Sequence, residues 1–285
     1  MRKIIAATFV SLDGVMQAPG GPEEDPVGGF KFGGWTFHYF DEVAGVAMDE
    51  LFSKPFALLL GRRTYDIFAA YWPYQKDPIA DAFNPATKYV ATHRPDTLTW
   101  QNTQSLGPDI VATLRRLKQE DGPDLLIQGS GNLIQTLLAN GLIDEIRLMI
   151  FPLLLGKGKR LFGDGAMPAA FKLIKSQASS TGVIMATYER SSEIKTGSFV
   201  TGEPSDAEIE RRKNWKWNCR SVAPSWSTSH PTELRSATFS HKERRRSLGH
   251  VARPIFNVGN WQGHARNLAF SPCGRRWIGA QRRDG

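Results

Sequence analysis

Cysteine is missing from the first 218 residues of this 285-residue chain, and the two cysteines present are Cys219 and Cys273. Disulfides, zinc sites built on thiolates and cysteine nucleophiles are therefore excluded from residues 1–218. The same absence excludes a zinc-dependent nucleobase deaminase there, because that chemistry needs a Cys-x-x-Cys pair beside a His-Glu pair.

Long apolar runs are also lacking, since no run approaches the roughly 20 residues that a membrane-spanning helix needs. Residues 1–10 resemble the start of a secretory signal, but Asp13 interrupts the apolar run and no small-residue cleavage site follows. We interpret this segment as a buried first strand. We therefore expect residues 1–190 to be cytoplasmic, with no membrane contact.

Charge is spread unevenly along the chain. Residues 1–190 contain 19 Lys and Arg against 20 Asp and Glu, whereas residues 211–285 contain 16 against 3. Residues 191–210 are acidic, with 1 against 5. The net charge of +8 therefore originates in the last quarter, and it says nothing about the partners of the rest.

Strand-like and helix-like segments alternate along the first 190 residues, and two strand-like segments come last. Alternation of this kind predicts an α/β fold, a sandwich with a mostly parallel central sheet. Short apolar runs predict the strands, and apolar residues at helical spacing predict the helices. The expected strands are 4–10, 56–60, 87–91, 125–128, 146–155 (broken at Pro152), 171–174 and 183–188. The expected helices are 41–52, 63–71, 109–119 and 131–139, the last of which Gly141 can end in a left-handed cap.

We expect residues 1–200 to form one domain and residues 201–285 to be a disordered extension with no assigned function. Residues 203–213 could form a short helix, with acids first and bases last as the helix dipole prefers. After Asn214 hydrophobic periodicity is nearly absent. Two alternatives stay open for this basic tail: phosphate neutralisation on nucleic acid, and a WD-like blade at 263–276, which could not bury its faces alone.

The most informative segment is an apolar strand that runs into Gly61, followed by Arg62, Arg63 and Thr64 at the start of a helix. Free N–H groups and the helix dipole favour an anion at such a place, and arginine forks add charge-assisted bonds to phosphate oxygens. The alternative is an ordinary helix start with surface arginines. We favour a nucleotide phosphate, and at least one arginine should face solvent.

A second junction of the same kind follows the strand at 125–128. Its residues are Gly129, Ser130, Gly131, Asn132 and Leu133. Without beta-carbons, backbone N–H groups could approach phosphates closely, although a tight turn that merely needs glycine is the alternative and the full G-x-G-x-x-G spacing is absent. Two such junctions in one domain indicate a ligand with more than one phosphate, such as a dinucleotide.

The first 200 or so residues resemble the dihydrofolate reductase-like superfamily, and within it bacterial proteins akin to the reductase (C-terminal) domain of riboflavin biosynthesis. The order and spacing of several segments carry the resemblance: residues 10–15 (VSLDGV), 34–35 (GW), 60–65 (LGRRTY), 127–131 (IQGSG), 155–158 (LGKG) and 161–162 (LF). The resemblance implies a three-layer fold, NADPH as cofactor, and hydride transfer to a pterin- or pyrimidine-like group. It also implies a homodimer.

The resemblance further assigns roles to individual residues. The cofactor side would include Ala7, both glycine junctions, and the corner of Thr92, His93 and Arg94, where basic residues would favour NADPH through its extra phosphate. A solvated loop is the alternative for that corner.

The resemblance places the substrate pocket around Asp13, Trp35 and Asp41, where a carboxylate could help protonate the hydride acceptor. Asp41 has the alternative of being only a helix N-cap. Asp13 could simply stabilise a turn, and Trp35 could simply pack the loop. The pattern around these three residues departs from that of folate reductases, which puts dihydrofolate itself in doubt.

The sequence therefore predicts an NADPH-dependent oxidoreductase of the dihydrofolate reductase or riboflavin-biosynthesis reductase type, acting on a small heterocycle. The alternative is an NADP(H)-binding module of the same fold that performs no turnover. A nucleic-acid function depends on the basic tail alone, and we do not favour it.

Overall fold

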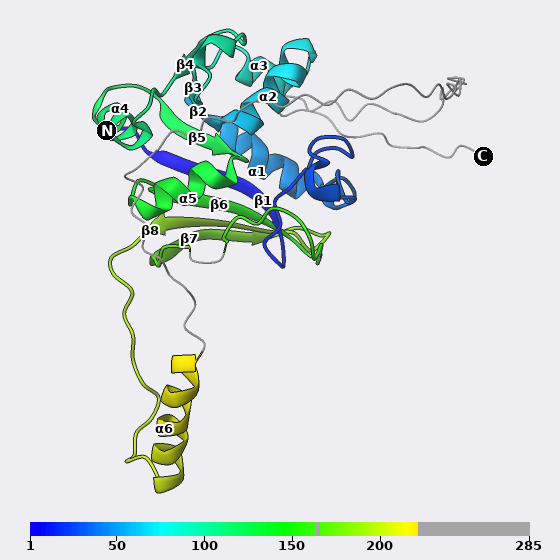
Figure 1. Ribbon diagram of the computed structural model, residues 1–285. Helices are drawn as coiled ribbons and strands as arrows, with labels where there is room; N and C mark the ends of the chain where they lie inside the picture. The colour runs from blue at the N-terminus through cyan, green and yellow to red at the C-terminus, as the bar shows by residue number, and fades with distance from the viewer. Residues whose placement is uncertain (164–165, 222–285) are drawn as a thin grey trace, which may run out of the picture. The chain divides into compact units, whose positions relative to one another are not determined.

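Eight strands form one sheet in the order β4-β3-β2-β5-β1-β6-β8-β7 (Figure 1). The computed structural model describes residues 1–163 and 166–221. Predictions for residues 222–285, including the WD-like blade and most of the extension predicted to be disordered, lie outside the described residues, whereas Asp206–Ser221 of that extension form a helix. The strands are β1 (Ile4–Ser11), β2 (Phe56–Gly61), β3 (Lys88–Ala91), β4 (Thr103–Ser105), β5 (Asp124–Gln128), β6 (Glu145–Phe151), β7 (Phe171–Ala178) and β8 (Ile184–Arg190). The helices are α1 (Glu42–Phe52), α2 (Arg62–Tyr71), α3 (Pro78–Phe83), α4 (Ile110–Gln119), α5 (Gly131–Ala139) and α6 (Asp206–Ser221).

The sheet is mostly parallel, as predicted. Strands β1 to β6 pair in parallel, and β8 joins β6 and β7 in antiparallel fashion. Helices α4 and α5 cover one face of the sheet, where their leucines pack on side chains such as Leu59 and Ile127. Helices α1, α2 and α3 cover the other face, above Leu58, Leu60 and Leu126. The predicted three-layer α/β sandwich is confirmed.

The central strands are apolar along their whole length because helices bury both faces of a parallel sheet. In β1, seven of the eight residues are buried. Strand β7 is the contrast, since it lies at the sheet edge and all but its first residue are exposed.

Three features differ from the sequence predictions. The strand predicted over 146–155 ends at Phe151, because Pro152 has no N–H to continue a ladder. Helix α3 and strand β4 were not predicted, since six and three residues are too short to show a period. The helix expected over 203–213 is α6, which continues to Ser221.

The sheet and its helices occupy residues 1–195, and α6 belongs to a separate unit that begins at Thr196. Glu208 on α6 pairs with Arg211 and Arg212, one turn further along the same helix. The predicted domain boundary at residue 200 stays a prediction. Within the described residues, no helix combines the length and the apolar character that crossing a bilayer requires.

Lys88 is the most deeply buried of the charged residues described in the sheet unit. Lys88 at the start of β3 is fully buried, and its Nζ donates to the carbonyl oxygens of Asn84 (2.6 Å) and Gln101 (3.2 Å). The amine also lies 4.1 Å from the ring centre of Trp100. Burial penalises the charged form and lowers the pKa of Lys88 to about 8.

Candidate functional site

The strand order itself marks a crevice between β1 and β5. These two strands are neighbours, yet β1 leads into α1 on one face and β5 leads into α5 on the opposite face. In parallel sheets, ligands bind outside the carboxyl ends of strands at such a switch point. Here Ala7 pairs with Gln128, directly before the glycine turn at Gly129. Ala7 and the second junction, both predicted to bind the cofactor, therefore lie together.

The two glycine junctions interlock. The N–H of Gly61 donates to Ser130 Oγ (2.9 Å), and the N–H of Ser130 donates to Thr64 Oγ1 (3.0 Å). This corrects the expectation that these amides are free for a phosphate, because each already has an acceptor on the other junction. The Thr64 hydroxyl proton has no acceptor assigned and remains able to donate.

The interlock sets the first turns of α2 and α5 side by side. Neither helix receives a side-chain cap from its N-cap residue, Gly61 or Ser130. Uncapped N–H groups of two adjacent helix starts make a strong place for a large anion. Gly129 has a φ of +62°, and a beta-carbon there would lie 3.3 Å from the Thr64 side chain. Glycine is therefore required at this turn by both conformation and space.

The two arginines at the start of α2 have different surroundings. Arg62 pairs with Asp66 and donates to the carbonyl of Arg94 and the hydroxyl of Thr97, so its side chain is only 21% exposed. It joins α2 to the loop after β3. The side chain of Arg63 is 55% exposed, and within residues 1–163 and 166–221 its one ionic partner is Asp25, 3.5 Å away.

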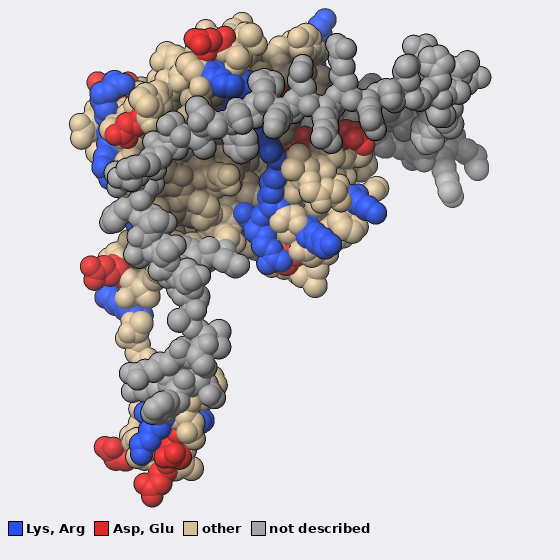
Figure 2. Space-filling view, in the orientation of Figure 1, with Lys and Arg blue, Asp and Glu red and all other residues tan. Residues whose placement is uncertain are grey.

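The corner of Thr92, His93 and Arg94 lies beside Arg62. Thr92 Oγ1 accepts the N–H of Arg94 (3.0 Å) and a longer bond from Arg62 (3.4 Å). His93 and Arg94 are exposed. On the face shown in Figure 2, further Lys and Arg side chains gather over the loops that follow β1 and β6.

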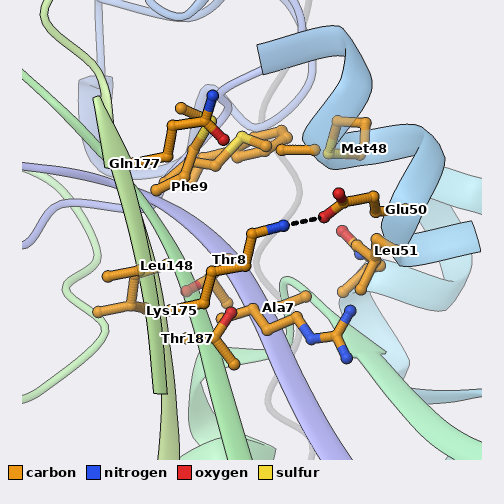
Figure 3. A pocket seen from close by; sticks show the side chains of 16 residues that line it. Ala7, Thr8, Phe9, Met48, Glu50, Leu51, Leu148, Lys175, Gln177 and Thr187 are labelled. Atoms are coloured by element: carbon orange, nitrogen blue, oxygen red, sulfur yellow. Dashed lines mark hydrogen bonds and ion pairs between the residues drawn. The ribbon is translucent and has the colours of Figure 1, made fainter. Parts of the chain in front are cut away.

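A cavity of about 70 Å³ lies between α1 and the sheet, in the same crevice (Figure 3). Ala7 and Phe9 of β1, Met48 of α1, and Met149 and Met185 of the neighbouring strands form its apolar part. Sites for small ligands usually measure about 300–1,000 Å³. The cavity must therefore open before a ring system can enter.

A buried polar atom at this cavity, Nε2 of Gln128, has no hydrogen-bond partner among the described residues. Oγ1 of Thr8, a residue 5% exposed on β1, has none either, but the alternation of β1 directs this side chain to the opposite face of the sheet from Ala7 and Phe9. An unsatisfied buried polar group costs about 1–3 kcal/mol, and native structures hold few of them. Gln128 is also the residue before the glycine turn, so it links the cavity to the two helix starts.

An ion pair crosses the cavity between α1 and β7. Lys175 Nζ lies 2.5 Å from Glu50 Oε2, and Figure 3 shows the lysine reaching from the strand toward the helix. Both side chains are about half exposed, at 55% and 54%. Arg147 of β6 also lines the cavity, with its Nε bound to Glu145 at 2.6 Å.

The predicted catalytic Asp41 is bound to backbone and hydroxyl donors. Its Oδ1 accepts the N–H of Ala44, which makes it the N-cap of α1, and its Oδ2 accepts the N–H and hydroxyl of Ser180. The Ala44 N–H, and then Ser180, lower the pKa of Asp41 below its ordinary value of 3.8. These contacts are those of the N-cap alternative, and a lowered pKa does not suit a proton donor.

Asp13 is bound in a similar way. It accepts the hydroxyl of Ser11 at 2.6 Å and the N–H groups of Leu155 and Gly156 at 3.1 and 2.8 Å. The Ser11 hydroxyl is the largest cause that lowers the pKa of Asp13, and both N–H groups add to it. The carboxylate therefore ties the loop after β1 to the loop after β6.

Trp35 is buried, with 8% of its surface exposed. Its indole N–H donates to the carbonyl of Gln17 (2.8 Å), and its ring meets Phe151 edge to face. Neither Trp35 nor the two aspartates line the cavity. The assignment of these three residues to catalysis stays a prediction, and their contacts fit the alternative roles.

Sequence reasoning missed four polar residues of the cavity: Glu50, Gln128, Arg147 and Lys175. For Gln128 a signal existed, since it directly precedes the second glycine turn. Glu50 shares a helical face with Ala47, three residues before it, which indicates the sheet side of α1. No local sequence signal predicts that Lys175 and Arg147 lie near Glu50 and Gln128. The order of the strands in the sheet brings them together.

The chain is similar to several known proteins. The model of the RibD C-terminal domain family matches residues 2–185. The uncharacterized protein YyaP of Bacillus subtilis (strain 168) is 28% identical over 199 residues, which is 66% of this chain and 94% of the relative. The uncharacterized protein YwjB of the same strain is 26% identical over 167 residues, covering 56% and 83%.

Two solved structures are also similar. One is a putative riboflavin biosynthesis protein from Shewanella sp. PV-4, with 24% identity, a TM-score of 0.44, and 67% of this chain and 99% of that chain covered. The other is dihydrofolate reductase from Enterococcus faecalis complexed with NADP(H), with 13% identity, a TM-score of 0.43, and 67% and 97% covered.

Proposed function

This chain belongs to the RibD C-terminal domain family, as its motifs predicted, and from that premise we propose that it is an NADPH-dependent reductase. The substrate we propose is a pterin- or pyrimidine-like heterocycle that accepts a hydride. The observation that carries this proposal is the position of Gln128. The side-chain amide of Gln128 has no hydrogen-bond partner among the described residues and lines the cavity. The backbone of Gln128 leads directly into the glycine turn, which lies between the two uncapped helix starts.

The residues present fit a dinucleotide with several phosphates. The first turns of α2 and α5 would hold the pyrophosphate, with the Thr64 hydroxyl as a further donor and Gly129 leaving room for close approach. Arg63 has an exposed guanidinium beside these turns, and Arg94 and His93 lie at the neighbouring corner. The positive charge of Arg63 and Arg94 favours the additional phosphate of NADPH over NADH.

The cavity under α1 would receive the two reacting rings. A bound nicotinamide supplies the hydride, and the chain supplies orientation, exclusion of water and a route for the proton. Phe9, Met48 and Met149 offer flat or adaptable apolar surface for a ring. The free amide of Gln128 can donate to a ring carbonyl, which would remove the cost of an unsatisfied group.

Glu50 is the carboxylate of the cavity that can exchange partners. An exposed ion pair contributes about 0–1 kcal/mol, so separating Glu50 from Lys175 costs little. Opening the pair would enlarge the cavity, and both side chains could then hydrogen-bond to the substrate ring. We therefore propose Glu50, in preference to Asp13 and Asp41, as the carboxylate that contacts the substrate.

The test is a titration of NADPH and NADH, followed by nicotinamide fluorescence, with Arg63→Gln compared against Arg116→Gln. Arg116 is exposed on α4 and pairs with Glu120 away from the crevice. We expect NADPH to bind more tightly than NADH. We expect Arg63→Gln to weaken NADPH roughly 10-fold or more, as for a charge-assisted bond, and Arg116→Gln to have no effect. A wild-type protein that binds neither nucleotide would contradict the proposal.

A binding module without turnover is the second candidate. The small cavity and the hydrogen-bonded carboxylates Asp13 and Asp41 favour it. NADPH oxidation measured across a panel of pterins, pyrimidines and quinones separates the two. Oxidation that Glu50→Gln reduces supports the reductase, whereas tight NADPH binding without oxidation by any acceptor supports the module. From the family resemblance we also propose a cytoplasmic homodimer.

A further inference from the structure

Asp25 lies between two cations that come from different parts of the chain. It belongs to the loop that joins β1 to α1, and its side chain is only 10% exposed. On one side it binds Lys159, which follows β6. On the other side, Arg63 Nη1 of α2 lies 3.5 Å from Asp25 Oδ1. The carboxylate of Asp25 thus connects its own loop to the loop after β6 and also contacts the predicted phosphate site.

The position of Asp25 does not depend on Arg63. The amide of Gln17 donates to the carbonyls of Asp25 (2.8 Å) and Val27 (2.9 Å), and its oxygen accepts the N–H of Lys159 (3.0 Å). The residue Gln17 is itself buried, with 5% of its surface exposed. Asp25 and Lys159 are therefore held together by a network in which Arg63 takes no part.

Of the two ion pairs that Asp25 makes with Lys159 and Arg63, the one with Arg63 is the weaker. At 3.5 Å it is an ion pair without a hydrogen bond, and the arginine side chain is 55% exposed. Arg63 can therefore turn toward a phosphate at the start of α2 while the bond between Asp25 and Lys159 stays intact. The same carboxylate, however, is a negative charge fixed beside an anion site, and it competes for the same guanidinium.

We propose that Asp25 is a positioning residue that sets the affinity of the site for phosphate ligands by competing for Arg63. This inference rests on the proposed function, in which Arg63 meets a phosphate of NADPH. Without a ligand, Asp25 holds Arg63 at the crevice. When a phosphate binds, it displaces the carboxylate from Arg63, and Lys159 keeps Asp25 neutralised. Breaking the contact between Asp25 and Arg63 therefore makes the net free energy of phosphate binding less favourable.

The test is a double-mutant cycle on NADPH affinity with Asp25→Asn, Arg63→Gln and the double variant. We expect Asp25→Asn to tighten NADPH binding roughly 3- to 10-fold, the range for a partly exposed charge pair. We expect the same change to have little effect once Arg63 is Gln. Glu120→Gln and Arg116→Gln on α4 form the matched control cycle, because they remove a comparable ion pair far from the crevice.

A second variant should change NADPH affinity in the opposite direction, so the inference can be tested even if Asp25→Asn does not fold. Thermal melting checks the folding of Asp25→Asn. Lys159→Met leaves Asp25 with Arg63 as its only cationic partner, so NADPH should bind more weakly. Asp25→Asn that leaves NADPH affinity unchanged, or that acts equally with and without Arg63, overturns the inference while the reductase proposal stands.

Inorganic pyrophosphate, titrated by calorimetry in the same variants, separates the two proposals further. Pyrophosphate that binds more tightly in Asp25→Asn, in a protein that does not bind NADPH, would support the competition and contradict the reductase. Absence of binding for both probes in the wild-type protein overturns both.

Discussion

Two groups of carboxylates in the sheet unit are held in different ways. In the first region, Asp41 at the start of α1 and Asp13 in the loop after β1 accept short hydrogen bonds from backbone N–H groups and nearby hydroxyls, and the contact of Asp13 to Arg160 is longer, at 3.6 Å. In the crevice, Glu50 and Asp25 pair mainly with long cationic side chains from other elements. A carboxylate that satisfies backbone amides cannot leave without orphaning them, whereas one that pairs with a lysine or arginine can exchange partners.

The energies differ accordingly. Leaving a buried N–H without an acceptor costs about 1–3 kcal/mol, while an exposed ion pair contributes about 0–1 kcal/mol. Substitutions in the first region should therefore change stability, and substitutions in the crevice should change ligand binding. Each prediction below tests this division.

The largest effect on stability is expected for Asp13→Ala. The change removes the acceptor for the N–H groups of Leu155 and Gly156 and for the Ser11 hydroxyl. Urea denaturation should show a loss of about 2–3 kcal/mol, against less than about 0.5 kcal/mol for the crevice variant Glu50→Ala. Equal losses in the two variants would remove the distinction between the regions.

Lys88 extends the comparison to a cation that is bonded to backbone carbonyls. Its pKa is about 8 in the folded protein and 10.5 in the reference state. Between these values the unfolded chain binds more protons, so stability should rise with pH. The full rise corresponds to about 3 kcal/mol at 1.36 kcal/mol per pKa unit. Denaturation midpoints from pH 7.5 to 10.5 should show it in the wild type.

Lys88→Met provides the control, because it removes the charge and keeps an apolar chain of similar length. The rise assigned to Lys88 should be absent from this variant. A variant that follows the wild-type curve throughout the range would show that another group is responsible.

The secondary structure was predictable because its signals are local. Asp41 was recognisable from sequence as a possible N-cap of α1, and that cap is formed. The Asp109 cap of α4 was not predicted, although the helix itself was. The period of the apolar residues located the central strands. Helix α3 escaped prediction because it is shorter than two turns, although Asp77 and Pro78 at its start are a recognisable signal.

The site was predictable only in part because its geometry is non-local. Both glycine junctions could be found, but not the hydrogen bonds between them, since Ser130 meets Gly61 and Thr64 through the order of strands. For Asp41 the sequence allowed two roles, a catalytic carboxylate and a helix N-cap, and it did not distinguish between them. The deciding partner, Ser180, lies in the hairpin between β7 and β8 and leaves no signal near Asp41.

In acid, the protein should lose the stability that Asp13 and Asp41 contribute in the first region. Hydrogen bonds lower the pKa of both Asp13 and Asp41 below 3.8, so their contribution is present above the unfolded pKa of about 4 and is lost as pH falls through the folded values. Melting temperatures from pH 5 to 2 should therefore fall less steeply in Asp41→Asn than in the wild type.

The smallest expected effect is that of Asp41→Asn on NADPH oxidation at neutral pH, and it is also the most decisive for the mechanism. Asparagine caps a helix about as well as aspartate, so the fold is kept while the acid is removed. If Asp41 only anchors α1, the oxidation rate with a responsive heterocycle should stay within about 3-fold of the wild type. If it donates the proton, the rate should fall by about 100-fold or more. Glu50→Gln is the companion measurement, because a substrate-contacting carboxylate in the cavity predicts that the larger loss occurs there.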